Sequence, residues 1–313
     1  MKYTEEIKKQ ILELNSMGNS SRSIAGFLGI SKSGINDFLF REKQEIHAVH
    51  NFDGPKILFL DLETAAALVM CFGRHKQFIN QDAVIKEGGW IICGGYRWMQ
   101  DDKSSVIYNK EQIRAGNDYE VCSELWQLFA KADAVVAHNL KNFDLKMLET
   151  RCLANGLPPL PNVQLIDTLE IAKKKFRFPS NKLDSLAAFL GIGRKVSHEG
   201  ILLWVKVQQG DEQALEAMLV YCEQDVDLLV EVFQALASRG LVSGFNAAMY
   251  YSDNKVRCHI CGSDNVEHSG RNVYTVVSQF AETRCNDCGA VARTRVNTLS
   301  IEKRKQLLTS PKA

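Results

Sequence analysis

The chain has 313 residues, of which 45% are hydrophobic and 24% charged, and its formal net charge is +1. These proportions are typical of a globular protein with one large α/β domain and small accessory modules. No apolar run approaches the ~20 residues that cross a bilayer, and the first residues lack the apolar core of a signal peptide. We therefore expect no membrane association and a cytoplasmic protein, in the host cytoplasm if a phage encodes it.

The charge is unevenly distributed along the chain. Residues 255–313 contain ten Lys or Arg against five Asp or Glu, a net +5, and residues 1–48 contain seven against six, a net +1. The middle must then carry −5. An acidic centre between basic or neutral ends fits a metal-binding catalytic domain flanked by modules that contact phosphate.

Residues 4 to about 45 are predicted to be helical, with a break at Met17-Gly18-Asn19. The segment 21–35 predicts a helix, a tight turn at Gly29 and a second helix capped by Ser31. It resembles the helix-turn-helix of recombinases and phage regulators, in which a small residue such as Ala25 lets the helices pack closely. In that case three residues would face DNA: Lys32, Ser33 and Asn36. A small helical bundle for protein contact is the alternative.

Residues 46–55 predict a linker, and the strand 56–64 follows it. Four apolar residues, 57–60, run into Asp61 and Glu63, whose i, i+2 spacing places both carboxylates on one face of a buried strand. Two like charges so close are costly unless a cation neutralises them, and carboxylate oxygens suit Mg²⁺ or Mn²⁺. A solvated acidic turn is the alternative for such a pair in isolation.

Strands and helices are then predicted in an order that implies a central mixed sheet flanked by helices. The predicted strands are 67–72, 89–99, 104–108, 132–139 and 163–166, and the predicted helices are 118–131, 144–156, 182–192 and 211–237. Asp144 begins one of these helices. Tyr221 and Asp225 lie one turn apart on the last one, hence on the same face.

Three motifs carry a resemblance to a known family over roughly residues 55–240. They are Asp61-Leu62-Glu63, His138-Asn139 with Phe143-Asp144, and Tyr221-Cys222-Glu223-Gln224-Asp225. In order and spacing they resemble the DEDD superfamily of 3′-5′ exonucleases, which have a ribonuclease-H-like fold. The Tyr four residues before Asp225 is the signature of the tyrosine branch. Within that branch, Asp167-Thr168 and the helix at Lys182 are similar to the proofreading exonuclease of family B DNA polymerases and its stand-alone phage and bacterial relatives.

The resemblance implies phosphodiester hydrolysis with two Mg²⁺ or Mn²⁺ ions. Asp61 would bridge both ions, Glu63 and Asp225 would complete the ion on the water side, and Asp144 would hold the other. Tyr221 would orient the nucleophilic water, since a phenol with a reference pKa of about 10 is a poor base near neutral pH. Too few residues follow Gly240 for a polymerase domain, so proofreading in cis is not expected.

Several further residues are candidates for substrate contact. Asn139 and Phe143 could touch sugar or base, although core packing is the alternative for Phe143. Lys182 and the run Lys173–Lys175 could touch phosphate, although a solvated charged face is the ordinary role of such runs. His138 is expected to be a hydrogen-bonded strand-end residue, and Asp167 either caps the next helix or supports the metal site.

The nine cysteines form two sets. Cys71, Cys93, Cys122, Cys152 and Cys222 are scattered singly and are expected to be reduced core residues. The other four form two Cys-x-x-Cys pairs, each followed by Gly: Cys258, Cys261, Cys285 and Cys288. With a strand predicted at 272–280, this pattern predicts a Cys₄ zinc ribbon with one structural Zn²⁺. Arg271, Arg284, Arg293 and Arg295 would suit nucleic acid, and a protein-binding ribbon is the alternative.

The sequence therefore predicts three domains: a helix-turn-helix (1–48), an α/β ribonuclease-H-like exonuclease (55–245) and a zinc ribbon (255–297). The leading hypothesis is a 3′-5′ exonuclease that prefers DNA to RNA and acts in replication, recombination or repair, with a protein of those processes as a possible partner. Three alternatives stay open: an exoribonuclease of the same fold, a nuclease of the transposase or resolvase type, and a non-catalytic nucleic-acid-binding adaptor.

Overall fold

The structure is a computed structural model that describes residues 3–16, 21–32, 34–35, 38–39, 54–73, 78–194 and 199–311. These residues belong to two compact units. The smaller unit holds the N-terminal helices, and the larger one begins at Gly54 and continues to the C-terminal region.

The N-terminal unit has its own small core. Its helices α1 (Glu5–Ser16) and α2 (Ser21–Leu28) enclose Ile11 and Ile24, which are fully buried together with Ile35. Gly29 has a φ of +66°, which allows the tight turn after α2. The Gly34 N–H donates to Ser31 Oγ at 3.1 Å, as expected of a helix cap.

Of the residues proposed for DNA contact in this unit, Lys32 is exposed. Ser33 and Asn36 lie outside the described residues, as does most of the predicted linker at 46–55.

The larger unit is built on a five-stranded mixed sheet with the strand order β5-β4-β1-β6-β7. The strands are β1 (Ile57–Thr64), β4 (Ile91–Trp98), β5 (Ser105–Tyr108), β6 (Ala134–Ala137) and β7 (Gln164–Asp167). β1 is central, antiparallel to β4 and parallel to β6. Its first four residues are completely buried, because helices cover both faces of the sheet. The predicted mixed α/β sheet is thus confirmed.

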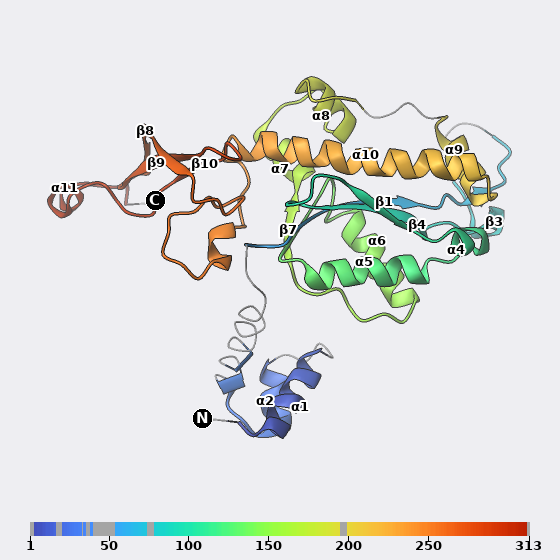
Figure 1. Cartoon of the computed structure of the whole chain (residues 1–313), viewed down its shortest axis with the longest axis horizontal. Helices are drawn as coiled ribbons and strands as arrows, with labels where there is room; N and C mark the ends of the chain where they lie inside the picture. The colour runs from blue at the N-terminus through green and yellow to red at the C-terminus, as the bar shows by residue number, and fades with distance from the viewer. Residues whose placement is uncertain are drawn as a thin grey trace. The chain divides into compact units, whose positions relative to one another are not determined.

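The long helix α10 (Glu212–Ala237) covers one face of the sheet, and α5 (Tyr119–Lys131) with α6 (Asp144–Ala154) lies on the other (Figure 1). The remaining helices are α4 (Lys110–Ala115), α7 (Thr168–Lys175), α8 (Leu183–Phe189) and α9 (Ile201–Gln208). Two glycines of β4 allow this close packing. A Cβ on Gly95 would lie 2.8 Å from Val226 Cγ2 of α10, and one on Gly94 would lie 2.8 Å from Leu125 Cδ2 of α5.

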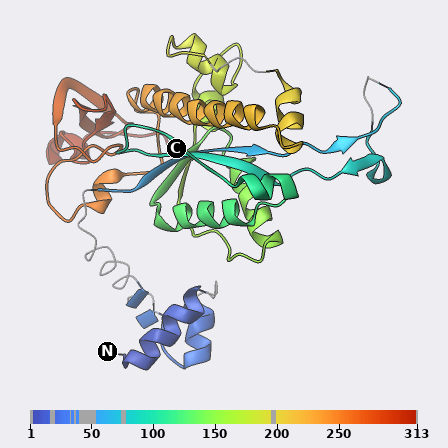
Figure 2. The ribbon, with the colours of Figure 1, turned by 45° about the vertical axis from the view of Figure 1, so that its right-hand side comes forward.

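Beyond the main sheet, β1 and β4 continue into a two-stranded arm (Figure 2). It contains β2 (Leu68–Val69), the 3₁₀ helix η1 (Gln81–Ala83) and β3 (Val84–Lys86). The strand predicted at 67–72 is therefore wrong in length, because only two of its residues have a pairing partner in this narrow ribbon. Cys71 is exposed, so its prediction as a core residue is also wrong, whereas Cys93, Cys122, Cys152 and Cys222 are buried.

The cysteine-rich region forms a second sheet with the strand order β10-β9-β8. Its elements are η2 (Ala247–Tyr250), β8 (Val266–Tyr274), β9 (Gln279–Cys285), β10 (Val291–Arg293) and α11 (Ile301–Lys305). The single strand predicted at 272–280 is wrong: the chain reverses there, with the Thr275 N–H donating to the Ser278 carbonyl at 2.8 Å. The β-branched residues that suggested a strand occupy the exposed hairpin end.

This second sheet packs against the C-terminal end of α10. Ile260 and Ala290 join the same buried cluster as Leu236 and Ala237 of α10. No helix in the described parts of the chain combines the length and the apolar character that a membrane span requires.

Candidate metal-binding active site

β1 delivers two carboxylates to one face of the sheet. Asp61 lies opposite Gly95 of β4 and Glu63 lies opposite Cys93, and directly opposed residues of an antiparallel pair share a face. The face is the one that α10 covers, because the missing Cβ of Gly95 would point at α10. Glu63 is buried and Asp61 is partly exposed. The strand therefore aims both carboxylates at the helix above it.

α10 supplies the third carboxylate and the tyrosine. Asp225 is 1% exposed and Tyr221, one turn earlier, is 8% exposed. Carboxylate oxygens of Asp61, Glu63 and Asp225 all lie within 4.8 Å of one another. The tight contact between α10 and Gly95 brings this helix close enough to the strand for that separation. The structure thus gathers three of the four carboxylates predicted from sequence.

Asp144 enters from the loop after β6, as the first residue of α6. It is 2% exposed, and its Oδ1 has no hydrogen-bond partner among the residues that the structure describes. Burial, with a smaller contribution from the nearby Asp167 charge, raises the pKa of Asp144 to about 7, although hydrogen bonds from the N–H groups of Asp144 and Leu62 lower it. The Leu62 contact places Asp144 beside the segment of β1 between Asp61 and Glu63.

Asp167 organises the loop that leads to Asp144. Its carboxylate accepts hydrogen bonds from the N–H groups of Asn139 at 3.1 Å and Lys141 at 3.2 Å, and also from Leu169 and Glu170 at the start of α7. Asn139 adopts a φ of +76°, which non-glycine residues rarely do. Asp167 therefore caps α7 and also holds the Asn139 loop, so the two roles considered from sequence coexist. Its position at the end of a buried strand was the available signal.

The other residues predicted to contact substrate differ in their exposure and hydrogen bonding. Asn139 is bound through its backbone, and Phe143 is exposed at 38%, which excludes core packing. Lys182 and Lys173–Lys175 are exposed at the ends of α8 and α7. Both ring nitrogens of His138 are hydrogen-bonded, to Thr168 Oγ1 at 2.9 Å and to the Asn181 carbonyl at 2.8 Å, as expected for a strand-end histidine.

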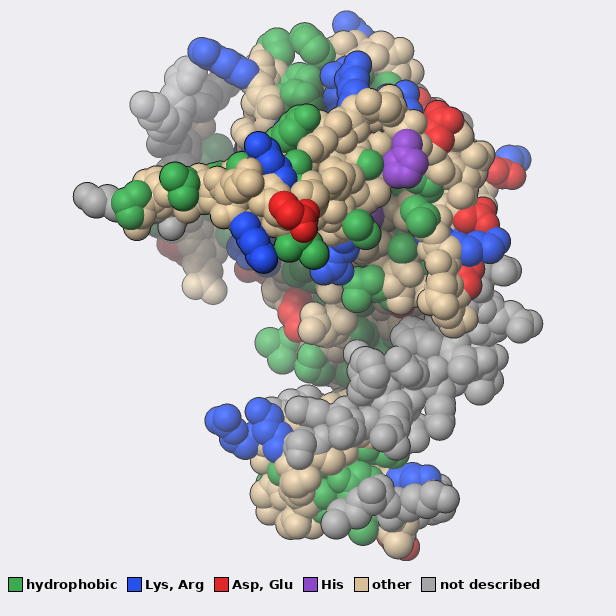
Figure 3. All heavy atoms as spheres, turned by 90° about the vertical axis from the view of Figure 1, so that its left-hand side faces the viewer, with side chains coloured by type: hydrophobic (Ala, Val, Ile, Leu, Met, Phe, Trp, Pro, Cys, Tyr) green, Lys and Arg blue, Asp and Glu red, His purple; other side chains and the backbone are tan. Residues whose placement is uncertain are grey.

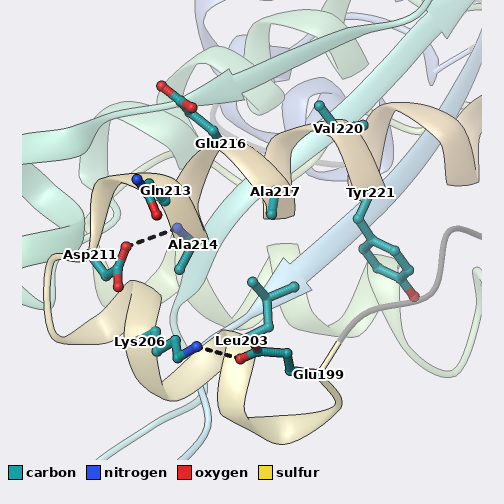
Figure 4. A pocket seen from close by; sticks show the side chains of 10 residues that line it. All are labelled: Glu199, Leu203, Lys206, Asp211, Gln213, Ala214, Glu216, Ala217, Val220 and Tyr221. Atoms are coloured by element: carbon teal, nitrogen blue, oxygen red, sulfur yellow. Dashed lines mark hydrogen bonds and ion pairs between the residues drawn. The ribbon is translucent and has the colours of Figure 1, made fainter.

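A groove of about 550 Å³ runs between α9 and the first half of α10. Tyr221 lies at one end of it, and Lys206, Glu199 and Asp211 line it (Figure 4). Lys206 and Glu199 form an ion pair across α9. The Trp204 ring meets the Tyr221 ring edge to face, with centroids 6.1 Å apart. The helix α9 was missed from sequence, although its apolar run between Gly200 and Gly210 was a usable signal.

The carboxylate cluster fits a divalent cation. Three buried or partly buried carboxylates with oxygens within 4.8 Å repel one another strongly unless a positive charge lies between them. Asp144 adds a buried oxygen that lacks a hydrogen-bond partner in the described part of the chain. An all-oxygen donor set matches Mg²⁺ or Mn²⁺.

The four cysteines of the C-terminal sheet form a second candidate metal site. Their sulfurs all lie within 4.8 Å of one another, with Cys258 and Cys288 at 3.5 Å and Cys261 and Cys285 at 3.7 Å. These separations are too long for disulfides and fit four thiolates at ~2.3 Å from one Zn²⁺.

The glycines that follow each pair shape the loops around the thiols. Gly262 and Gly289 have φ values of +77° and +72°. The N–H groups that follow them, of Ser263 and Ala290, hydrogen-bond the thiols of Cys261 and Cys288. The positive φ of each glycine therefore lets the chain turn so that the next N–H points at a thiol.

On the face that Figure 3 shows, the described cationic side chains around this site do not form one continuous patch. Arg293 stacks on the Phe280 ring at 4.0 Å, and Arg257 stacks on Tyr251 at 4.0 Å while pairing with Asp253. Figure 3 shows that blue Lys and Arg side chains on the viewed face are separated by acidic, apolar and other side chains.

A sequence-family model matches the part of the chain that holds β4 to β7 and α10. Residues 84–237 match the sequence model of the family described as the RNase_H superfamily. β1, with Asp61 and Glu63, lies just before the matched range. No curated protein matches the chain.

Among solved structures, the chain is similar to the family B DNA polymerase from the hyperthermophilic archaeon Pyrobaculum calidifontis. The sequence identity is 14% and the TM-score is 0.44. The match covers 59% of this chain and 25% of the polymerase, so the chain corresponds to about a quarter of that protein's length.

Proposed function

We propose that this protein is a metal-dependent 3′-5′ exonuclease of the tyrosine-branch DEDD type that prefers DNA to RNA. The observation that carries the proposal is the convergence of Asp61, Glu63 and Asp225 within 4.8 Å, with Tyr221 one helical turn from Asp225. The match of residues 84–237 to the RNase_H superfamily model supports phosphodiester hydrolysis as the reaction class. A non-catalytic adaptor would have no reason to maintain such a costly group of buried like charges.

The carboxylates would hold the catalytic ions. Asp61, Glu63 and Asp225 form one donor set, and Asp144, which accepts from the Leu62 N–H of β1, contributes a further buried oxygen. Bound divalent ions would supply positive charge to the reacting phosphate and favour deprotonation of the attacking water. Asp167 would act as a positioning residue, since it fixes the backbone that leads to Asp144.

Tyr221 would orient the attacking water by hydrogen bonding. Its ring is fixed between α10 and Trp204, so the hydroxyl has a restricted position at the end of the groove. The groove between α9 and α10 would hold the terminal nucleotide, with Lys206 available to a phosphate when its ion pair with Glu199 opens.

The flanking modules would increase the local concentration of substrate. The four cysteines would bind one structural Zn²⁺, and the N-terminal helices would bind DNA as a helix-turn-helix. A role in replication, recombination or repair, with a protein of those processes as partner, fits such an assembly, as does a phage origin.

The test is degradation of 5′-labelled single-stranded DNA and a matched RNA in Mg²⁺ or Mn²⁺. We expect a ladder that shortens from the 3′ end, is stronger on DNA, and is absent in Asp61→Asn. Glu231→Gln, an exposed carboxylate on α10, is the matched control and should retain full activity. Preferred cleavage of RNA would indicate the exoribonuclease, internal cuts a transposase-type nuclease, and binding without cleavage an adaptor.

A further inference from the structure

The arm beyond the main sheet is a direct continuation of the strand that carries the carboxylates. β1 pairs with β6 only as far as Phe59, but it pairs with β4 as far as Thr64. The pairing continues through Ala65, whose N–H donates to the Trp90 carbonyl at 2.8 Å, and then through β2 and β3. The arm is therefore attached to Glu63 by a short, hydrogen-bonded segment.

The arm exposes large apolar side chains on a ribbon of only two strands. Phe72 is fully exposed and Phe78 is nearly so, and four aliphatic side chains are also largely exposed: Leu68, Met70, Ile79 and Ile85. A two-stranded ribbon has no core of its own to stabilise it. Exposed apolar groups concentrated in this way mark a surface that binds something.

The charge of the arm favours a polyanion as its occupant. Lys86 of β3 lies directly opposite Leu68 of β2 and hence on the same face. In the sequence, Arg74 and Lys76 lie between the two phenylalanines, at positions outside the described residues. Residues 68–87 thus carry three cations, with Lys86, against two acidic residues, Asp82 and Glu87, a net +1. Aromatic rings combined with cations are the features by which proteins hold unpaired nucleic-acid strands, because every base can stack on a ring.

We propose that the β2–β3 arm binds the bases of a single nucleic-acid strand by stacking on Phe72 and Phe78, at a distance from the scissile phosphate. The inference deepens the proposed function and depends on it, since the same strand would reach the carboxylates. Phe72 is nine residues beyond Glu63, so it lies at most about 30 Å along the strand direction. A substrate of a few nucleotides would occupy the carboxylate site without reaching the arm.

The experiment compares two double variants of the full chain. Phe72→Ala with Phe78→Ala removes both rings, and Met70→Ala with Ile79→Ala removes neighbouring apolar side chains of the same arm. The probe is a fluorescein-labelled oligothymidylate of about 20 nucleotides, longer than the ~4–16 nucleotides that one single-strand-binding module covers. Its dissociation constant is measured by fluorescence anisotropy in an Asp225→Asn background, so that the strand stays intact.

We expect the phenylalanine variant to bind the oligothymidylate about tenfold or more weakly per ring, and the control variant to bind it within about twofold. In the active chain, cleavage of a thymidylate trimer should be unchanged by either pair. Unchanged affinity for the long strand in the phenylalanine variant would overturn the proposal and indicate a protein-docking arm. If the parent chain neither binds nor cleaves the oligothymidylate, the exonuclease proposal fails as well, so the two failures are distinguishable.

Discussion

The carboxylate cluster and the cysteine cluster each gather groups that repel one another when ionised, but they differ in what supports them. Asp61 and Glu63 follow four fully buried residues of β1, and Asp225 lies on a helix with fourteen buried residues. The cysteines lie beside β8, which has no buried residue, and β9, which has two. The buried core of the main sheet therefore holds the carboxylates in place. The cysteines have little buried core around them, so their bound metal must help to fold this region.

The largest effect is expected for loss of a zinc ligand. Cys285→Ser should abolish zinc binding and unfold residues 258–293, because structural zinc contributes on the order of 10 kcal/mol to segments without a core of their own. The main sheet should persist, since most of the buried cluster that it shares with the cysteine region lies on the sheet and on the helices that cover it. Zinc content by mass spectrometry and local hydrogen exchange test both parts.

Cys71→Ser is the matched control for this variant, because Cys71 is exposed and distant in sequence from the four-cysteine cluster. It should leave zinc content and exchange unchanged. If Cys285→Ser kept its full zinc content and the protection of β9 from hydrogen exchange, the cysteine region would not depend on this thiol and its metal for folding.

The next effect concerns activity rather than folding. Asp225→Asn should reduce cleavage by about 10³-fold or more, beyond the ~10–100-fold cost of losing an outer-sphere partner of a metal site. The free energy of unfolding without divalent ions should not fall, because the change removes one of three mutually repelling charges. Initial rates and denaturant unfolding, with Glu231→Gln beside it, measure both quantities. A loss of stability parallel to the loss of activity would show that Asp225 also stabilises the folded state.

Asp118, a buried carboxylate of the same domain outside the carboxylate cluster, provides an internal reference. Its charge is balanced by a side chain of the protein, Arg151, rather than by a metal ion. Asp118 is fully buried and accepts from Arg151 Nε at 2.7 Å, from Arg151 Nη2 at 2.8 Å, from Asn155 Nδ2 at 2.8 Å and from the Ile91 N–H at 2.8 Å. Burial alone would raise the pKa of Asp118, but these hydrogen bonds outweigh it and hold the pKa below its usual value. The buried charge of Asp118 is therefore neutralised without a metal ion.

Asp118→Asn should therefore cost about 3 kcal/mol at pH 7, because it leaves the Arg151 charge uncompensated. A lowered pKa in the folded state stabilises the protein above the unfolded value of about 3.9, and this contribution disappears as the pH falls through the folded pKa. The difference in unfolding free energy between wild type and Asp118→Asn should thus stay constant down to about pH 5 and shrink below about pH 4.

Urea unfolding at pH 7 and at about pH 3.5 measures this dependence. Glu111→Gln, which removes an exposed carboxylate 3.9 Å from Arg114, should cost less than about 1 kcal/mol at either pH. An Asp118→Asn penalty that is equal at both pH values would mean that packing, rather than charge, stabilises this pair.

The sequence was most informative where local pattern and burial agree. The run before Asp61 predicted a buried strand, and the i, i+4 spacing of Tyr221 and Asp225 placed them on one helix face, because both inferences depend only on backbone periodicity. The two Cys-x-x-Cys pairs were equally informative, since ligand spacing is local.

Features that depend on tertiary contacts were missed. The arm was predicted as an ordinary strand at 67–72, because periodicity does not reveal whether a strand has neighbours. The hairpin end at 275–278 was assigned to a strand because Thr275, Val276 and Val277 have high β propensity, which the turn overrides. The two roles of Asp167 depend on Asn139, which is 28 residues away in the chain.

The smallest of the expected effects is that of removing the Tyr221 hydroxyl. It separates the orientation of the attacking water from the charge of the carboxylates. Tyr221→Phe should lower kcat by about 10–100-fold with little change in KM, since the hydrogen bond to the reacting water is removed while the ring stays. The edge contact with Trp204 is retained by phenylalanine, so the unfolding free energy should be unchanged.

Tyr250→Phe is the matched control, because Tyr250 also packs against an aromatic ring, that of Phe245 at 5.9 Å, but belongs to η2 near the cysteine cluster. It should leave kcat unaffected. If Tyr221→Phe raised KM instead and left kcat intact, the hydroxyl would bind substrate in the groove rather than orient water. The carboxylates would then position the nucleophile without help from α10 beyond Asp225.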